Sequence, residues 1–418
     1  MSSAARTAQD SGAQSLETQL QRPLREVDSQ KWLAPLLTQY GFAVGVVLTG
    51  CGNNIVKQIA TRPLTHYTYI LSLADAVAYL PVYGAILLTF LASGIVPGNQ
   101  ITFMWCRPGQ RFPYFLLMVA AGFASAAADV VGMICTPYVT GPLHSLLSNC
   151  TSVYVALLSI LLLRQRYSLL QVAALLFVLA AVIIGILPSF AKQDPTVSNQ
   201  TNPFFALLLA LSCIGNALSF ILKEFLFKRY DGWLMEEYGQ TSEKGLNIFV
   251  LNTHEAIAQL PFTLILVPLN VAFGQTNGQS LVEYLKEATD CVFQSTPDVC
   301  GSESSHAEWA GKLTLMYVVF NLCMNVTTLM AVKYGSALGT FVALKAIFPV
   351  SMVLFAYVQW PLLGKTDIHW LTWMSVLVLL PSIGVYQWAT IQQNKRAAIH
   401  PSLASCCWPF GATRGWQS

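Results

Sequence analysis

Residues 168–188 read SLLQVAALLFVLAAVIIGILP, a run that contains no Asp, Glu, Lys or Arg. An α-helix that crosses a bilayer needs about 20 mostly apolar residues, so this run is long enough. The whole chain has the same character: 54% of its 418 residues are hydrophobic, 10% are charged, and the mean hydropathy is +0.53. A soluble fold of this length could not bury so much apolar surface. The sequence therefore predicts an all-α integral membrane protein surrounded by a lipid bilayer.

Further runs of this kind occur along the chain, and together they predict ten transmembrane helices. The predicted spans lie near residues 38–59, 69–93, 113–135, 141–163, 168–188, 204–226, 247–270, 313–334, 336–359 and 368–390. With both chain ends in the cytosol, most lysines and arginines fall on the cytosolic side, as the positive-inside rule requires. We therefore expect cytosolic tails over 1–37 and 391–418, with the first span acting as the targeting signal.

Several classes of function are excluded by the same sequence. The net charge is +3, and no basic block indicates nucleic-acid binding. The ten cysteines show no CxxC or Cys/His spacing, so we expect no metal and no cofactor. An enzyme would need a positioned nucleophile or metal cluster, and no HExxH, DxD or GxSxG motif is present. We therefore expect no enzymatic activity.

A glycosylation sequon supports the predicted orientation. Asn199 begins the sequence Asn-Gln-Thr within the linker 189–203, which the topology places on the lumenal side. Two further sequons, at Asn149 and Asn325, fall inside predicted spans and should stay unmodified. We therefore expect glycosylation at Asn199, in a lumenal compartment.

The long lumenal loop over 271–312 contains a second mark of the same side. Cys291 and Cys300 bracket a short segment there, and an oxidising lumen would let them pair in a disulfide; the alternative is two unpaired thiols. Residues 281–288 have apolar positions at helical spacing and are predicted to lie on the membrane surface. The loop is then either a lumenal cap or a plain spacer.

The chain also contains a weak internal duplication, with an offset near 200 residues between corresponding segments. Five spans in each half, over 38–188 and 204–390, would cross the membrane in opposite directions. In transporters built this way, the substrate site lies between the halves near mid-membrane. The first span of each half has a small and polar cluster followed by lysine: Cys51, Gly52, Asn53 and Lys57, and Cys213, Gly215, Asn216 and Lys223.

Several short segments together resemble the chloroquine-resistance-transporter-like family of the drug/metabolite transporter superfamily. They are Asn53–Val56 including Asn54, His66–Tyr69, the stretch from Ala128-Asp129 through His144-Ser145 to Tyr167, Lys223-Glu224, Phe227–Tyr230, and Asn321 with Asn325. The resemblance implies ten helices as two inverted five-helix repeats around a central cavity. It also implies movement of small peptides, amino acids or organic cations, driven by proton or potential gradients. Lys345, inside the ninth span, is a departure from the family pattern.

Ionisable residues inside spans are costly unless they face water or a partner, so they are candidates for function. Asp75, Asp129, Glu255 and Lys345 are the clear examples, each on a stripe of polar or small residues. Asp75 and Asp129, with Lys57 near the lumenal rim, give the lumenal half of the membrane a negative field that favours cationic substrates. Glu255 and Lys345 lie deeper, and we expect a breakable ion pair between them.

Other polar residues follow the same helical spacing on neighbouring spans. They either line a shared aqueous cavity or form hydrogen bonds between packed helices. His144 and His254 could titrate between pH 5 and 8, although a lone histidine on an apolar span is more often a packing residue. Candidate substrate- or proton-binding residues among them are Asn53, Asn54, His144, Ser148, Asn216, Asn252, Asn321 and Asn325.

We therefore predict a secondary transporter of small metabolites, such as amino acids, small peptides, glutathione or organic cations. Protons or the membrane potential would drive transport from an acidic lumen to the cytosol. The lumenal marks favour a vacuolar or lysosomal membrane over a plastid membrane. An exchanger of nucleotide-sugars or phosphorylated metabolites is an alternative, but such anions would require several deep lysines or arginines. A non-transporting accessory membrane protein is the second alternative.

Overall fold

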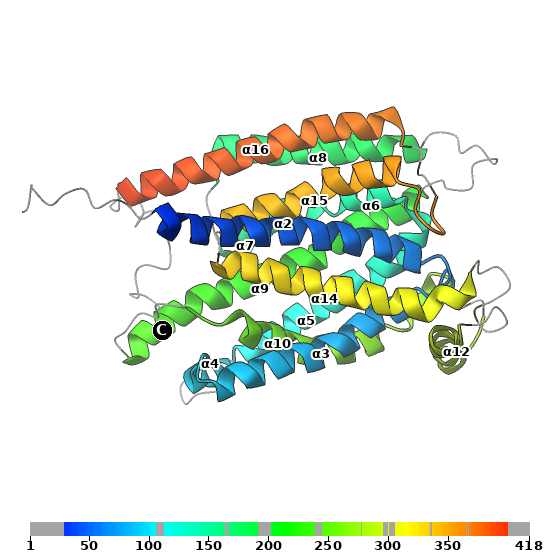
Figure 1. Ribbon diagram of the computed structural model, residues 1–418, viewed down its shortest axis with the longest axis horizontal. Helices are drawn as coiled ribbons and strands as arrows, with labels where there is room; N and C mark the ends of the chain where they lie inside the picture. Colours follow the sequence, from blue (N-terminus) through cyan, green and yellow to red (C-terminus); the bar gives the residue numbers. More distant parts are fainter. Residues whose placement is uncertain are drawn as a thin grey trace, which may run out of the picture.

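All regular structure in the described part of the chain is helical, apart from an isolated bridge between Trp360 and Gly364. The computed structural model describes residues 29–105, 113–163, 167–190, 202–238, 245–276, 278–295, 300, 306–334, 337–364, 366 and 368–399. Its long helices run side by side in one bundle (Figure 1). The prediction of an all-α protein is confirmed.

Seven membrane-length segments in the described part of the chain are apolar enough to cross a bilayer. One of them is a broken helix, because its chain turns between α6 and α7 at Ser148 and Asn149. The seven are formed by α3 (Tyr69–Ala92), α5 (Phe115–Cys135), α6 (Gly141–Leu147) with α7 (Cys150–Leu163), α8 (Leu169–Phe190), α9 (Pro203–Tyr238), α10 (Ile248–Ile265) and α16 (Trp370–Ile399).

Three more long helices lie in the same bundle without meeting that criterion. They are α2 (Ser29–Ala60), α14 (Ala310–Tyr334) and α15 (Ala337–Tyr357). Asparagines inside α2 and α14 lower the apolarity of these helices, at Asn53 and Asn54 in the first and at Asn321 and Asn325 in the second. All four of these asparagine side chains are partly buried in the bundle.

The packing partners of the helices follow a regular scheme. Helix α2 packs along α14 and α15, while α9 packs along α5 and α7. Helix α10 contacts both α3 and α5, α14 also contacts α3, and α8 packs along α16. Counting α6 with α7 as one helix, exchanging the first five long helices with the last five in chain order converts each of these pairs into an observed pair. Two of the pairs, α3 with α10 and α8 with α16, are converted into themselves. The packing scheme is thus consistent with a two-fold relation between the halves.

Short helices lie at the ends of the bundle. Helix α4 (Gly98–Met104) follows α3, and α12 (Leu281–Gln294) precedes α14 at the opposite end (Figure 1). The remaining short elements are η1 (Thr136–Tyr138), α11 (Leu269–Ala272) and η2 (Ala307–Trp309). Four long helices differ from the predicted spans by five residues or more: α2 begins earlier, at Ser29, α9 and α16 extend further, to Tyr238 and Ile399, and α10 ends sooner, at Ile265.

Candidate functional site

A polar ladder joins α3 to α14 in the interior of the bundle. Asp75 Oδ2 accepts a hydrogen bond from Asn321 Nδ2 at 2.6 Å. One helical turn further along, the Tyr79 hydroxyl accepts from Asn325 Nδ2 at 3.2 Å and donates to Asn321 Oδ1 at 2.9 Å. The Tyr317 hydroxyl accepts a second hydrogen bond from Asn321 at 2.9 Å. We call Asp75, Tyr79, Asn321 and Asn325 the α3–α14 ladder.

A second ladder joins α5 to α10. Ser125 Oγ donates to Glu255 Oε1 at 2.9 Å, and Gln259 Nε2 donates to Asp129 Oδ2 at 2.9 Å. Helix α9 adds two groups to Glu255: the Ser219 hydroxyl at 2.6 Å and the Lys223 ammonium, whose Nζ lies 2.5 Å from Glu255 Oε2. We call Ser125, Asp129, Glu255 and Gln259 the α5–α10 ladder.

The two ladders have the same construction. In each, two residues one turn apart on one helix bond to two residues one turn apart on the other, because side chains at i and i+4 share a helix face. In the α3–α14 ladder, the hydrogen bonds Asp75–Asn321 and Tyr79–Asn325 each join residues 246 positions apart, and the bond from Tyr79 to Asn321 is an additional diagonal one. Both cross-links of the α5–α10 ladder join residues 130 positions apart. Asp75 thus corresponds to Glu255, and Asn325 corresponds to Asp129.

Close helix contacts hold the α5–α10 ladder in place. A Cβ at Gly122 of α5 would lie 2.9 Å from the Glu255 carbonyl oxygen and 2.9 Å from the Gln259 nitrogen, so the two backbones touch there. Gly215 of α9 meets the backbone of Ala124 in the same way. Small residues permit such approach between membrane helices. Three backbones therefore converge on the Glu255 carboxylate, which is buried.

A third polar group lies between α2 and α6. Lys57 Nζ is 3.4 Å from His144 Nε2, and Asn54 Nδ2 donates to Ser145 Oγ at 3.4 Å. The charges of Asp129 and Asp75 also act on Lys57, although neither carboxylate is within ion-pair distance in the described chain. That Lys57 acts together with the two carboxylates therefore stays a prediction.

Lys345 does not pair with Glu255, so that prediction was wrong in the conformation described. Its Nζ donates to Asn149 Oδ1 at 3.2 Å, at the break between α6 and α7. Glu255 instead pairs with Lys223, which the positive-inside rule assigned to the cytosolic side. Lys223 lies one turn after Ser219 on α9, and this spacing was the signal that could have placed both side chains on one face.

The remaining candidates are placed as follows. Asn53 donates weakly to Met324 Sδ at 3.6 Å, and Ser148 donates to the His144 carbonyl one turn earlier at 3.0 Å. Asn216 and Asn252 are half-buried on α9 and α10. Besides Lys223, the residues that sequence reasoning did not select as sites are Tyr79, Ser125, Ser219, Gln259 and Tyr317.

His254 belongs to a packing arrangement rather than to a polar ladder. Its Nδ1 lies 2.6 Å from the Val250 carbonyl oxygen, and its ring contacts Trp105 and Phe115. These contacts favour the packing interpretation for this histidine.

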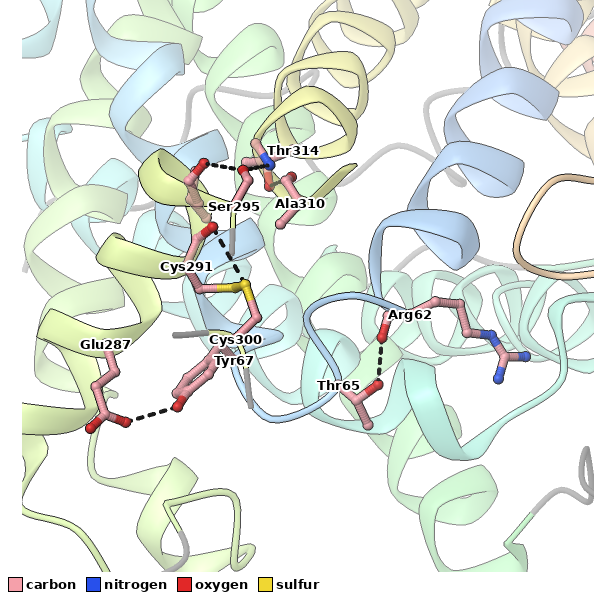
Figure 2. The surroundings of a disulfide bond; sticks show 11 residues. Arg62, Thr65, Tyr67, Glu287, Cys291, Ser295, Cys300, Ala310 and Thr314 are labelled. Carbon is pink, nitrogen blue, oxygen red and sulfur yellow. Dashed lines mark hydrogen bonds between the residues drawn. A yellow bond between two sulfur atoms is a disulfide. The ribbon is translucent and has the colours of Figure 1, made fainter. Parts of the chain in front are cut away.

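At the end of the bundle, α12 is tied down by a disulfide and a hydrogen bond (Figure 2). Cys291 and Cys300 are joined in a disulfide with a Cα–Cα distance of 4.8 Å. The Tyr67 hydroxyl, in the α2–α3 connection, donates to Glu287 Oε2 at 2.8 Å. Burial, together with the neighbouring Glu287 carboxylate, raises the pKa of Tyr67 to about 12. The α12 helix is thus an ordered cap over this connection; Asn199 lies outside the described residues.

An all-helical bundle with membrane-length apolar helices and buried carboxylates is the architecture of an integral membrane transport protein. Residues 40–386 match the model of the CRT-like (chloroquine-resistance transporter-like) family, and the chain belongs to that family. The expected resemblance is confirmed. This membership supports a membrane transporter of small metabolites, and the family's name describes transporters rather than enzymes.

Relatives of this chain occur in Arabidopsis thaliana, Dictyostelium discoideum and Toxoplasma gondii. Protein CLT2, chloroplastic, of Arabidopsis thaliana is 26% identical over 318 residues, covering 75% of this chain and 67% of the relative. Protein CLT1, chloroplastic, of the same plant is 24% identical over 357 residues, covering 85% and 74%. The chloroquine resistance transporter of Toxoplasma gondii is 26% identical over 323 residues, covering 74% of this chain but 33% of the relative.

Proposed function

We propose that the protein is a secondary transporter that moves small metabolites, such as amino acids, small peptides, glutathione or organic cations, across an endomembrane. The observation that carries the proposal is the placement of three carboxylates, Asp75, Asp129 and Glu255, on neighbouring helices inside the bundle. Asp75 and Glu255 are buried and Asp129 is half-buried. Charges placed in this way are expensive in a membrane protein and are typical of ion and substrate pathways. Family membership supports the same function.

The proposed architecture has ten transmembrane helices in two inverted repeats. Two observations support it: the packing scheme is preserved when the halves are exchanged, and the α3–α14 and α5–α10 ladders correspond residue by residue. Asp75 and Glu255 each lie about two turns after the start of their helix, α3 and α10. These two helices start toward opposite ends of the bundle (Figure 1). Corresponding carboxylates approached from opposite ends suit a carrier that alternates its access.

Asp129 is the proposed site where a proton or a cationic substrate couples to this movement. Its carboxylate accepts from the neutral Gln259 amide, and no lysine or arginine is within ion-pair distance of it in the described chain. An isolated carboxylate costs several kcal/mol inside a membrane. A proton or a bound cation would remove that cost, so the loaded carrier reorients more readily than the empty one.

The proposed direction is from an acidic lumen to the cytosol, across a vacuolar or lysosomal membrane. The sequon at Asn199 and the disulfide beside α12 support a lumenal, oxidising side. The chloroplastic relatives keep a plastid membrane as the second location.

The test is uptake by the purified full-length protein in proteoliposomes under an imposed pH gradient, screened over amino acids, glutathione, short peptides, organic cations and nucleotide-sugars. Asp129→Asn should lower pH-driven uptake at least tenfold, equivalent to about 1.4 kcal/mol, while the protein still folds. The matched control is Glu308→Gln, because this carboxylate is 61% exposed outside the bundle. Unchanged uptake by folded Asp129→Asn protein would remove this residue from the mechanism, and uptake of nucleotide-sugars alone would favour the exchanger.

A further inference from the structure

The corresponding carboxylates of the two ladders differ in how their charge is balanced. Glu255 is paired with Lys223 at 2.5 Å. Asp75 has no lysine or arginine at that distance among the described residues, and its Oδ1 is buried without a hydrogen-bond partner. Among the described residues, an otherwise two-fold arrangement therefore contains a carboxylate–ammonium ion pair in one half only, because the Lys57 ammonium of the other half lies beside His144 and not against Asp75.

The ammonium group of Lys223 occupies a site built for a cation. Glu255 Oε1 accepts from the hydroxyls of Ser219 at 2.6 Å and Ser125 at 2.9 Å, which leaves Oε2 for the lysine. The close approach at Gly122 and Gly215 holds the three helices that carry these groups. The carboxylate side chain is 8% exposed, whereas the lysine side chain is 21% exposed and so retains room to move away.

We propose that the Lys223 ammonium is a tethered stand-in for the ammonium group of a substrate. In the empty carrier it neutralises Glu255; a substrate with a primary ammonium group displaces it and forms the same contact with Oε2. Breaking a buried ion pair without replacement leaves an uncompensated charge. Lys223 can therefore leave only when another cation arrives. This inference rests on the proposed transport function and names its substrate class.

The proposal makes a specific claim about chemistry. An N–H donor is needed at Glu255 Oε2, because the lysine contact is a charge-assisted hydrogen bond and not charge proximity alone. A primary ammonium can supply that donor, and a quaternary ammonium cannot. A site that requires an N–H donor binds primary ammonium groups selectively, whereas a general negative field would attract any organic cation.

The first test is chemical rescue of the full-length protein with the atoms that the substitution removes. Lys223→Ala deletes a propylammonium group, so n-propylammonium should raise its melting temperature in detergent in a concentration-dependent way. Tetramethylammonium, which has the same charge and no N–H, should not. The double variant Lys223→Ala/Glu255→Gln should show no rise in melting temperature with n-propylammonium. Lys286→Ala, at an exposed position on α12, should show the same change in melting temperature as the wild-type protein. Equal shifts in all variants, or an equal response to both cations, would overturn the proposal.

The second test uses Lys223→Met, which keeps the apolar stem in case the alanine variant fails to fold. With L-lysine as the probe, net uptake into empty vesicles should fall at least tenfold, because the empty carrier now returns with a bare Glu255. Exchange against L-lysine loaded inside should stay within about twofold of wild type. Equal loss of both rates would make Lys223 structural. Wild-type protein that moves no solute at all would refute the proposed transport function, while the rescue experiment would still decide the role of Lys223.

Discussion

Replacing Gly122 by alanine is the most direct test of how the α5–α10 ladder is held. The added Cβ would lie 2.8 Å from the Ala258 Cβ, 2.9 Å from the Gln259 nitrogen and 2.9 Å from the Glu255 carbonyl oxygen. Two of these three atoms belong to the backbone and cannot rotate away. Helices α5 and α10 must then move apart, which stretches both cross-links of the ladder, now 2.9 Å each.

The expected cost follows from these contacts. Overpacking of a well-packed site costs about 1–3 kcal/mol. Weakening two hydrogen bonds adds roughly 1 kcal/mol each, and the helix preference of alanine over glycine returns about 0.5–1 kcal/mol. We therefore expect Gly122→Ala to be destabilised by roughly 2–4 kcal/mol in total. Transport should fall as well, because Glu255 and Asp129 are both displaced.

The matched control is Gly84→Ala in α3, where a Cβ would meet nothing within 4 Å. There the substitution should be neutral or stabilising by up to about 1 kcal/mol, because only the helix preference changes. Both variants are compared by thermal unfolding in detergent and by initial uptake rate. If Gly122→Ala melts at or above Gly84→Ala with wild-type transport, the two backbones are not in contact and the reasoning fails.

Three further predictions concern the side of the membrane that we propose to be lumenal. Cys291→Ser and Cys300→Ser should each lower the melting temperature equally, with no further loss in the double variant, since the thiols share one bond; additive losses on thermal unfolding would contradict this. The raised pKa of Tyr67 means that its stabilising contact is complete below pH about 10 and is lost as the pH rises through about 12. Between these two pH values, the melting temperature of Tyr67→Phe should therefore fall less than that of the wild-type protein. An equal fall in both proteins would mean that another group titrates. Finally, an endoglycosidase should increase the gel mobility of the protein expressed in a eukaryotic host, and Asn199→Gln should abolish the shift. A mobility shift that persists in Asn199→Gln would show that the glycan is attached to another residue.

The carboxylates illustrate how far periodicity alone can lead. Asp75, Asp129 and Glu255 are recognisable because an ionisable residue inside an apolar run is expensive, whatever its partners. Helical spacing also predicts which residues share a face, such as Asp75 with Tyr79. Spacing within a helix carries no information about which neighbouring helix that face meets. For this reason the sequence alone predicts that Glu255 pairs with Lys345 and that Lys223 lies at the cytosolic end of its helix.

The internal duplication is likewise only partly visible in the sequence. Cys51 and Cys213 were recognisable as members of similar clusters, and the structure gives them similar contacts: each thiol approaches a backbone carbonyl of a neighbouring helix, at Ile347 and at Leu147. The correspondence between Asp75 and Glu255 could not be read from a single offset, because the connections between helices differ in length in the two halves. It emerges only when the hydrogen-bonded pairs are compared.

The solvent and the class of this protein can be predicted from the amino-acid order: the apolar runs require a bilayer, the lysines and arginines predict an orientation, and short motifs indicate the CRT-like family. These properties depend on composition and local spacing, which a linear chain displays directly. The pairing of side chains requires the folded bundle: Lys223 with Glu255, Gln259 with Asp129, and Asn321 with Asp75. Such pairs join residues far apart in the chain, and they form because small residues let particular helices approach closely enough for short side chains to meet.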